Sequence, residues 1–337
     1  MADHGLEIRG SDTGNEPDDD REIDMEIERE ISLLEAEAVL SVGCKGPVVL
    51  APQRRWISLT GVCLTTVLFG MAAVPDRALA WGNEGHRVVA LIARSYLTPQ
   101  AQARVDQLLA ADAADTLTAP DMASRATWAD KWRNEDPATA GWHYTNLTPA
   151  NADPAEACAG PKSCSIEQVD RFAAELADPT VNQDEKVFAL KMVLHLVGDL
   201  HQPLHNIEMG HDGGGNCERV TFTGKNGHPR PLSLHAYWDD ATVEALGPSA
   251  EAIAADLRGR ITQSQVRTWS AGRARTWAQD GYLIAVQVAY AGGAPVVCGM
   301  GPTLLSPAYQ DHAREAAALQ LERAGIRLAT VLNRALR

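Results

Sequence analysis

The sequence VFALKMVLHLVGDLHQPLH, residues 187–205, combines a helical apolar pattern with side chains that bind metals. Apolar residues recur through Val187–Leu200 at the three- and four-residue intervals of an α-helix. His195 and Asp199 are four residues apart in this pattern, so a helix places them one turn apart on the same face. Neutral imidazole and carboxylate are good zinc ligands. The stretch therefore predicts a buried helix with a metal-binding face.

Similar helical patterns fill most of the chain after residue 80. They cover Glu84–Leu97, Ala101–Leu109, Ile166–Leu176, Ser249–Ile261, Trp269–Val288 and Ala308–Leu336. Alternation typical of a strand is confined to Glu218–Thr223. Gly, Pro, Asn and Asp accumulate in loops at Pro149–Pro161, Gly210–Asn216 and Gly224–Pro231. We therefore expect an all-α fold with long loops in a single domain.

The first 55 residues differ in composition from the remainder. They carry 14 acidic and 6 basic side chains and no Phe, Trp or Tyr, which is typical of a disordered segment. This segment precedes a predicted signal peptide. A start codon assigned too far upstream would explain the presence of the segment. We expect residues 1–55 to contribute nothing to function.

A secretory signal peptide is predicted at residues 56–80. Arg54 and Arg55 precede an apolar run, Trp56–Val74, and the small residues Ala78-Leu79-Ala80 follow it. A membrane anchor is the alternative, because the run is nearly long enough to span a bilayer. Cleavage before Trp81 would release a mature domain, residues 81–337, as a secreted or periplasmic protein.

Charge and cysteine content narrow the classes of function. The formal net charge is −14, of which residues 1–55 contribute −8, so the rest of the chain is near −6. A basic surface is therefore excluded as the means of binding nucleic acid. Four cysteines follow the expected cleavage site, which indicates two disulfides in an exported protein. Of the three possible pairings we favour Cys158 with Cys164 and Cys217 with Cys298, with free buried thiols as the alternative.

A second pair, His235 and Asp239, repeats the spacing of His195 and Asp199. One such pair alone is more often an ordinary hydrogen-bonded or exposed pair. Here further candidate ligands lie nearby in the sequence, namely Trp128-Ala129-Asp130, Trp142-His143-Tyr144 and His205, together with the glycine-rich stretch His211–Asn216. This concentration of imidazole and carboxylate favours a metal centre.

These motifs resemble those of the zinc-dependent single-strand-specific nucleases of fungi, plants and bacteria, the S1/P1 nucleases. The resemblance begins at Trp81-Gly82-Asn83-Glu84-Gly85-His86, continues through residues 128–133, 142–144 and 195–205, and ends at His235-Ala236-Tyr237-Trp238-Asp239. Bacterial zinc phospholipase C is similar in fold and in ligand order. The resemblance implies a mostly helical domain with a trinuclear zinc cleft.

The family pattern implies three Zn²⁺ ions. The first would be held by Asp130, His143, His195 and Asp199, and the second by His205, His235 and Asp239. In the third site the amino nitrogen and carbonyl oxygen of Trp81 would chelate the ion together with His86, and Asp199 would bridge to the first. Trp81 has a free amino group only after cleavage behind Ala80, so this site and the signal peptide predict the same cut.

The resemblance also implies the reaction. The expected enzyme hydrolyses single-stranded DNA and RNA to 5′-phosphate products and has 3′-nucleotidase activity, since zinc activates water and paired ions stabilise displacement at phosphorus. Asp130 would lie beside the nucleophile, and Arg133 matches an arginine that contacts phosphate, unless it is a surface ion-pair residue. Tyr144 matches an aromatic residue on which a base stacks, with core packing as the alternative. Asn146 replaces a base-contacting carboxylate of the fungal enzymes, which leaves the base preference open.

A phospholipase C that acts on phospholipid head groups is the alternative function. Asp239 stands where that branch uses glutamate, and the 29 residues between His205 and His235 resemble the longer nuclease loop. A structural zinc protein fits less well, because structural sites usually close with four protein ligands, often cysteines. The expected substrates are therefore single-stranded nucleic acid and 3′-nucleotides, bound by a monomer without stable membrane association. The remaining histidines of the mature domain match no ligand position and are expected in loops or at the surface; they are His201, His211, His228 and His312.

Overall fold

The computed structural model describes residues 81–337, apart from residues 113, 159–163, 292–297 and 300. The expected acidic extension and signal peptide, residues 1–80, lie outside the described residues. Within the described part of the chain, no helix combines the length and the hydropathy needed to cross a bilayer.

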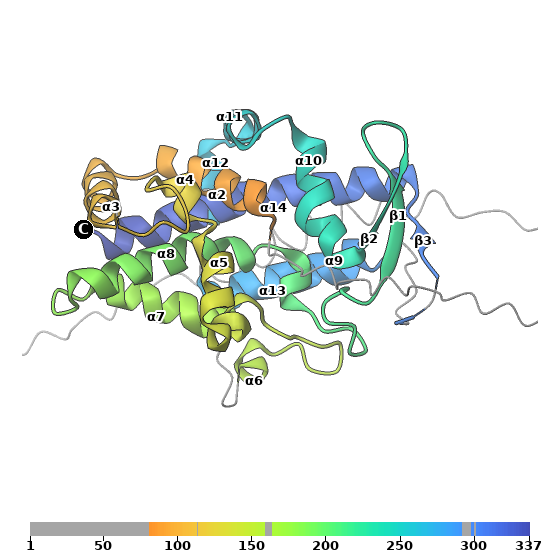
Figure 1. The fold of residues 1–337 in the computed structure, drawn as a ribbon, viewed down its shortest axis with the longest axis horizontal. Helices are drawn as coiled ribbons and strands as arrows, with labels where there is room; N and C mark the ends of the chain where they lie inside the picture. Colours follow the sequence, from red (N-terminus) through yellow and green to blue (C-terminus); the bar gives the residue numbers. More distant parts are fainter. Residues whose placement is uncertain (1–80, 113, 159–163, 292–297, 300) are drawn as a thin grey trace, which may run out of the picture. The chain divides into compact units, whose positions relative to one another are not determined.

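Helices make up the framework (Figure 1), which confirms the all-α class. The longer helices are α2 (Asn83–Ser95), α3 (Pro99–Ala111), α7 (Ser165–Ala177), α8 (Gln183–Asp199), α11 (Ala250–Arg260), α13 (Ala274–Ile284) and α14 (Pro307–Ala335). The shorter ones are α4 (Met122–Arg125), α5 (Trp128–Glu135), α6 (Pro154–Ala157), α9 (Leu234–Ala236), α10 (Thr242–Leu246) and α12 (Gln263–Trp269). Two 3₁₀ turns, η2 (Pro137–His143) and η3 (Pro203–Asn206), and two π turns, η4 (Tyr237–Ala241) and η5 (Ala285–Ala289), join them.

Helix α8 starts and stops where its sequence dictates. The Asn182 side chain accepts a hydrogen bond from the backbone N–H of Glu185, which caps the first turn. Pro203 has no backbone N–H to donate and disfavours the α conformation in the residue before it, so the helix ends ahead of it. Every residue of α8 from Val187 to Asp199 is buried, apart from Phe188. The helix that the sequence predicts most clearly is therefore also the most enclosed.

One predicted helix begins too early. The pattern predicts a helix over Trp269–Val288, but α12 ends at Trp269 and α13 begins only at Ala274. Gly272 lies between them with a φ of 80°, a left-handed conformation that glycine adopts without a steric penalty. The last turn of the predicted helix is the π turn η5. The apolar spacing continued across the break, so periodicity alone did not reveal it.

A small sheet contains more strands than expected. Strand β1 (Arg219–Thr223) is the predicted one, and it pairs antiparallel with β2 (Pro229–Ser233), with Arg219 opposite Ser233. Strand β3 (Thr303–Leu304) pairs in parallel with the other side of β1. Strand β2 carries two prolines and was predicted as loop, and its place at the sheet edge is where proline is tolerated.

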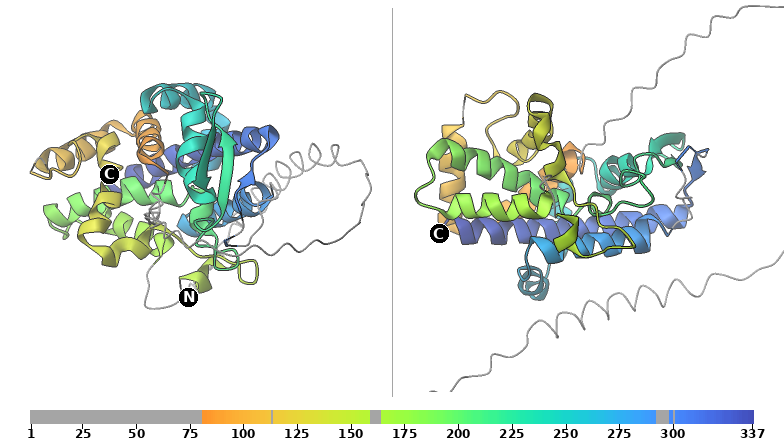
Figure 2. Two further views of the ribbon diagram at one scale, coloured as in Figure 1. Left: turned by 45° about the vertical axis from the view of Figure 1, so that its right-hand side comes forward. Right: turned by 90° about the horizontal axis from the view of Figure 1, so that it is seen from below.

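Helix α2 lies at the centre of the helical core, in contact with α8, α11 and α14. Its residues Val88, Val89 and Ile92 are fully buried. Gly325 of α14 faces Ile92 so closely that a Cβ there would clash, so α2 and α14 pack backbone to side chain. Figure 2 shows from two further directions that α7, α8 and α14 run beside one another, and these three helices also contact each other.

Both favoured disulfides are formed. Cys158 is bonded to Cys164 ahead of α7, and Cys217 to Cys298, which ties the start of β1 to the segment before β3. The second bond links residues 81 positions apart, so it restricts the unfolded chain far more than the first does. The pairing prediction is therefore confirmed.

Candidate metal centre

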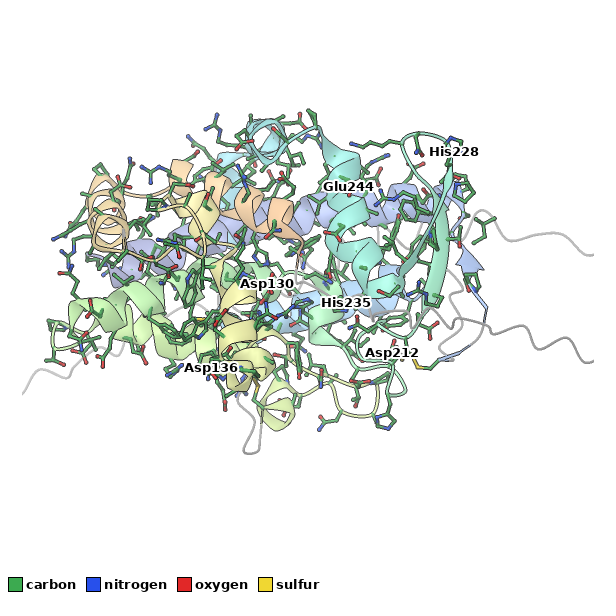
Figure 3. All side chains as sticks on the ribbon, in the orientation of Figure 1. Asp130, Asp136, Asp212, His228, His235 and Glu244 are labelled. Carbon is green, nitrogen blue, oxygen red and sulfur yellow. A yellow bond between two sulfur atoms is a disulfide. The ribbon has the colours of Figure 1, made fainter. Side chains whose placement is uncertain are left out.

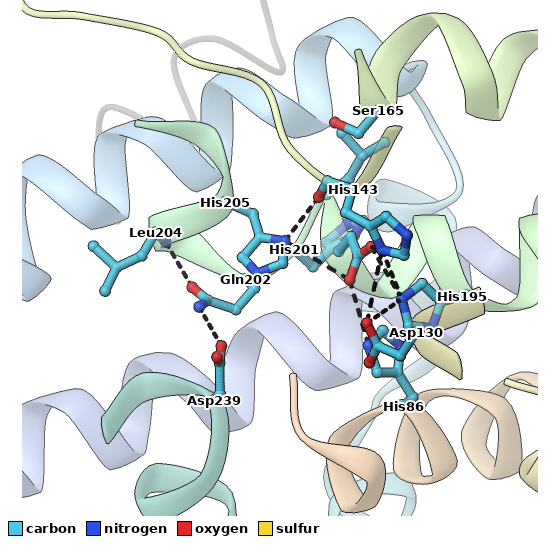
Figure 4. Close-up of polar contacts among 12 residues, drawn as sticks. His86, Asp130, His143, Ser165, His195, His201, Gln202, Leu204, His205 and Asp239 are labelled. Carbon is cyan, nitrogen blue, oxygen red and sulfur yellow. Dashed lines mark hydrogen bonds and ion pairs between the residues drawn. The ribbon is translucent and has the colours of Figure 1, made fainter. Parts of the chain in front are cut away.

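His195 and Asp199 lie on one face of α8, as their spacing predicts. Both side chains are fully buried, and His195 Nε2 is 3.2 Å from Asp199 Oδ2. Other predicted donors converge on this pair from α2, α5, η2 and η3 (Figures 3 and 4). The donors form three groups, each with ligand atoms within 4.8 Å of one another: a first group (Asp130, His143, His195), a second group (His205, His235, Asp239) and a third group (His86, His195, Asp199).

The first group gathers around one oxygen of Asp199. His143 Nδ1, at the end of η2, lies 3.0 Å from Asp199 Oδ2 and 3.1 Å from His195 Nε2. Asp130, on α5, places its Oδ1 3.7 Å from His195 Nε2. Nitrogen and oxygen atoms from three separate elements thus point at one small volume.

The third group uses the other oxygen of the same carboxylate. His86 Nε2, on α2, is 3.3 Å from Asp199 Oδ1. The His86 ring stacks on the His195 ring with a centroid distance of 3.8 Å. Gly198 permits this approach, because a Cβ there would lie 2.8 Å from His86 Nδ1. Asp199 therefore has one oxygen toward each of two groups, the arrangement of a bridging carboxylate.

The second group lies at the junction of α9 and η4. His235 Nε2 is 3.2 Å from His205 Nε2 and 3.4 Å from Asp239 Oδ2. The expected one-turn spacing of His235 and Asp239 is thus realised across the start of a π turn. The Gln202 side chain donates to Asp239 Oδ1 at 2.5 Å, which orients that carboxylate.

Three imidazoles are oriented through the ring nitrogen that faces away from the groups. His195 Nδ1 lies 2.7 Å from Ala126 O, His205 Nδ1 2.8 Å from His143 O, and His235 Nδ1 2.7 Å from Gly214 O. A carbonyl accepts only from a protonated nitrogen, so each Nδ1 carries the hydrogen and each Nε2 presents a lone pair. This is the second contact that metal-ligating histidines typically make.

The electrostatic environment shifts the pKa values of the donors in different directions. Burial lowers the pKa of His205 to about 3 and that of His235 to about 4, so both rings are neutral at physiological pH. For Asp199 burial raises the pKa, but His195 and a hydrogen bond to His143 outweigh it and lower the pKa. The pKa of Asp239 is raised by burial, and that of His195 is raised because the Asp199 and Asp130 carboxylates outweigh its burial. His205, His235 and Asp199 are therefore in the form that binds metals, whereas the shifts at Asp239 and His195 favour the protonated forms.

The donor set fits divalent cations. Within the described part of the chain, both oxygens of Asp130, Oδ1 of Asp199, Oδ2 of Asp239 and Nδ1 of His86 are buried without a hydrogen-bond partner. Buried polar atoms are costly unless they are paired, and the Nε2 lone pairs of His205 and His235, which face each other at 3.2 Å, repel one another. A bound cation would satisfy these atoms. Their nitrogen-and-oxygen chemistry is that of zinc sites.

Trp81 lies at the foot of α2, five positions before His86. Its indole is fully buried, and its Cβ faces Gly85, where any side chain would collide with it. The next backbone N–H, that of Gly82, donates to Asp239 O at 3.0 Å. Trp81 is thus held between α2, which carries His86 of the third group, and η4, which carries Asp239 of the second group.

The predicted substrate-contacting residues flank the first group. Arg133 lies one turn along α5 from Asp130, with Nη1 3.5 Å from Asp130 Oδ1. Tyr144 and Asn146, on either side of the buried Thr145, are exposed, and 43 % of Tyr144 is accessible. The core-packing alternative for Tyr144 is therefore wrong. Tyr144 and Asn146 are thus accessible to solvent, and Arg133 is ion-paired with a donor of the first group.

Sequence reasoning missed a buried ion cluster beneath the first group. Lys191 Nζ, one turn before His195 on α8, lies 2.7 Å from Asp115 Oδ2 and 3.1 Å from Asp112 Oδ1. Arg125 is also buried, with Nε 2.8 Å from Asp112 Oδ2. Arg125 adjoins Ala126, whose carbonyl receives the His195 N–H. The only signal in the sequence was a lysine within the mostly apolar stretch of α8.

One histidine expected at the surface is buried. His201 follows the last turn of α8, and its Nδ1 donates to Val197 O at 2.7 Å. Arg327 of α14 donates from Nη1 to His201 Nε2 at 3.0 Å and pairs with Asp280 at 2.7 Å. His201 therefore lies in a loop, one of the two places expected for it, but it is not at the surface because the chain after α8 turns inward against α14. The other three, His211, His228 and His312, are exposed as predicted.

Comparison with known proteins extends over the whole described domain. The family model of the S1/P1 nucleases matches residues 81–337. Nuclease S1 of Aspergillus oryzae is 27% identical over 285 residues, which are 77% of this chain and 93% of the relative. Nuclease P1 of Penicillium citrinum is 27% identical over 277 residues, 75% of this chain and 97% of the relative. Endonuclease 2 of Arabidopsis thaliana is 28% identical over 278 residues, 75% of this chain and 90% of the relative.

Proposed function

The chain belongs to the S1/P1 nuclease family, and we therefore propose that it is a zinc-dependent phosphodiesterase that hydrolyses single-stranded DNA and RNA. The family assignment supports a hydrolase that cleaves the phosphodiester bonds of nucleic acids. The proposal adds that the products carry 5′-phosphates and that 3′-nucleotides are also substrates. One observation carries it: three buried donor groups, two of which share His195 and adjoin Asp199, lie beside an arginine and an exposed aromatic ring.

We assign one Zn²⁺ to each group. Asp130, His143, His195 and Asp199 would hold the first, and His205, His235 and Asp239 the second. The third would be held by His86, by the second oxygen of Asp199, and by the backbone amino and carbonyl groups of Trp81. Bound zinc would supply activated water and stabilise negative charge on the phosphate. Three Zn²⁺ ions would bring six positive charges against three negative charges from Asp130, Asp199 and Asp239, so the centre would stay cationic in an acidic domain.

The protein side chains divide the remaining work. Asp130 would accept the hydrogen bond of the attacking water and orient it. Arg133, at 3.5 Å from Asp130, would bind a phosphate oxygen from the same side. Tyr144 would stack on a base, which suits a strand whose bases are not paired. Asn146 would reach the edge of that base with either the donor or the acceptor of its amide.

The proposed protein is secreted or periplasmic and begins at Trp81. Two disulfides support an oxidising compartment. The family match starts at residue 81, the first residue after the predicted signal peptide. A free amino group on Trp81 then becomes one of the metal donors. We further propose that the mature protein acts as a monomer.

Zinc-loaded protein starting at Trp81 provides the test. It is incubated with single-stranded DNA, single-stranded RNA, duplex DNA, 3′-AMP and phosphatidylcholine vesicles, and the products are identified by mass spectrometry. We expect cleavage of both single strands to 5′-phosphate ends, release of phosphate from 3′-AMP, and little action on the duplex. Intact nucleic acids would overturn the proposal, and hydrolysis of phosphatidylcholine alone would favour a phospholipase C.

A further inference from the structure

The loop between η3 and β1 has an unusual backbone. Gly210, His211, Gly213, Gly214 and Gly215 all have φ between 62° and 81°. Such left-handed conformations suit glycine but strain a residue with a side chain, as at His211. A run of five glycine-rich positions also loses much conformational entropy when it is ordered. Specific contacts must therefore hold the loop in place.

A single buried carboxylate supplies those contacts. Asp212 is 2 % exposed, and its Oδ1 accepts from the backbone N–H groups of Met209 at 3.1 Å and Gly214 at 3.0 Å. Its Oδ2 accepts from the N–H of Gly215 at 2.8 Å and from the Tyr290 hydroxyl at 2.6 Å. Four hydrogen bonds to a charged acceptor are stronger than the same number between neutral groups. Tyr290, which follows η5, thereby attaches the loop to α13.

The loop in turn holds His235 (Figure 3). The Gly214 carbonyl lies 2.7 Å from His235 Nδ1, and the Gly215 carbonyl accepts from the His235 backbone N–H at 3.2 Å. On its other side, Gly214 abuts the Leu204 carbonyl so closely that no Cβ fits. The loop therefore contacts both histidine-bearing segments of the second group.

One peptide unit connects the carboxylate to the imidazole. The carbonyl of Gly214 and the N–H of Gly215 belong to the same planar peptide, so Asp212 binds one end of it and His235 binds the other. A hydrogen bond from the N–H to a carboxylate polarises the peptide and makes its carbonyl a stronger acceptor. This is the carboxylate–histidine arrangement of metal sites with a peptide inserted between the two partners.

We propose that Asp212, supported by Tyr290, is a positioning residue that fixes the tautomer and the orientation of His235 for the second metal. It touches neither metal nor substrate, and it acts through the Gly214–Gly215 peptide. The inference rests on the proposed function in one respect, namely that the second group holds zinc. Its consequence is that the affinity of this one site depends on a carboxylate outside the donor set.

The test compares Asp212→Asn, Tyr290→Phe and Asp280→Asn with the unaltered protein. Asparagine keeps the size of Asp212 but replaces one acceptor by an NH₂ donor, which then opposes two backbone N–H groups. Tyr290→Phe keeps the loop sequence and removes one of the four hydrogen bonds. Asp280→Asn is the matched control, since it also alters a partly buried carboxylate, the partner of Arg327, without contact to any donor group.

Two quantities are measured on protein that retains its far-ultraviolet circular dichroism spectrum. Competition with a chromophoric chelator gives the affinity of each zinc, and nuclear magnetic resonance gives the water-exchange rate of the His235 Nδ1 proton at saturating zinc. We expect Asp212→Asn to weaken one zinc about 10- to 100-fold and to accelerate that exchange. Tyr290→Phe is expected to change both quantities in the same direction by a smaller factor, and Asp280→Asn to leave both unchanged.

The inference is overturned if Asp212→Asn and Tyr290→Phe hold every zinc with unaltered affinity, or if Asp280→Asn weakens the same zinc as strongly. Unaltered protein without any bound zinc would instead refute the proposed function. In that case the exchange rate of the His235 Nδ1 proton still tests the link between Asp212 and His235, so the two failures are distinguishable.

Discussion

In the proposed function Arg133 binds the phosphate of the substrate at the first group. Its side chain is 17 % exposed, and its Nη1 lies 3.5 Å from Asp130 Oδ1, so it contacts both the solvent and the donors. We expect Arg133→Ala to lower kcat/KM for single-stranded DNA about 10²- to 10³-fold, because it removes a charged donor to the phosphate. The zinc content should stay the same. Steady-state kinetics and metal analysis of one preparation measure both.

Arg230→Ala is the control for this substitution. Arg230 is an arginine at the surface, ion-paired with Glu244 at 2.6 Å, and exposed ion pairs contribute little. We expect its kinetics to be unchanged. An Arg133→Ala enzyme with undiminished kcat/KM would refute the assignment of Arg133, and a loss of zinc would show that it acts on the metal donors instead.

Single residues could be predicted where their role follows from local spacing. His195 and Asp199 were found because four residues make one helical turn, whatever lies around them. Asp212 and Lys191 were not found, because their partners are distant: Tyr290 is 78 positions from Asp212, and Asp115 is 76 positions from Lys191. No local pattern encodes such a contact.

Helix α8 joins the buried ion cluster to the donor groups. Lys191, His195 and Asp199 follow one another at four-residue steps, and Lys191 Nζ also lies 3.9 Å from the centre of a Trp128 ring. We expect Lys191→Met to lower the free energy of unfolding by about 2 kcal/mol. Complete loss of the partner of a buried charge costs about 3–5 kcal/mol, and here Arg125 still compensates part of the charge. Urea unfolding measures the difference.

Lys186→Met is the matched change on the same helix. Lys186 is only partly buried near the start of α8, and the same substitution there likewise removes a charged amino group. We expect its free energy of unfolding to remain within about 0.5 kcal/mol of the parent. Equal stabilities for the two variants would mean that the cluster beneath the first group does not support the helix.

Elements were predictable where one signal dominates. The boundaries of α8 follow from a capping asparagine and a proline. The boundary between α12 and α13 was missed, since Gly272 alone interrupts a continuing apolar pattern. Strand β2 was missed because its two prolines argue against a strand, and only the pairing with β1 makes the segment regular. Tertiary contacts decide such cases, and a single sequence does not contain them in readable form.

At the scale of the whole molecule, Trp81 and Gly82 pack against the proposed metal centre. Trp81 is buried, and the backbone N–H of Gly82 donates a hydrogen bond to the carbonyl of Asp239, in the middle of η4. We expect a protein that retains Ala80 before Trp81 to bind one zinc fewer and to lose most of its activity, because an amide nitrogen is a far poorer donor than an amino group. Metal analysis and the nuclease assay measure these effects.

A protein extended by one alanine after Arg337 serves as the control, since it adds the same residue at the other end of the domain. It should bind as much zinc as the parent. Mass spectrometry must verify the first residue of each sample. Three zincs and full activity in the Ala80-containing protein would remove Trp81 from the proposed donor set.

The packing of α2 against α14 also has a consequence for folding during synthesis. Helix α2 is the first described helix to be synthesised, and α14, which covers Ile92 through Gly325, is the last. Until α14 is synthesised, the apolar face of α2 formed by Val88, Val89 and Ile92 is therefore incompletely covered, and exposed apolar surface is prone to aggregate. The hydrophobic core of the domain therefore cannot close until α14 has been synthesised. A chain that lacks α14 leaves the apolar face of α2 partly exposed, so this surface needs shielding during synthesis.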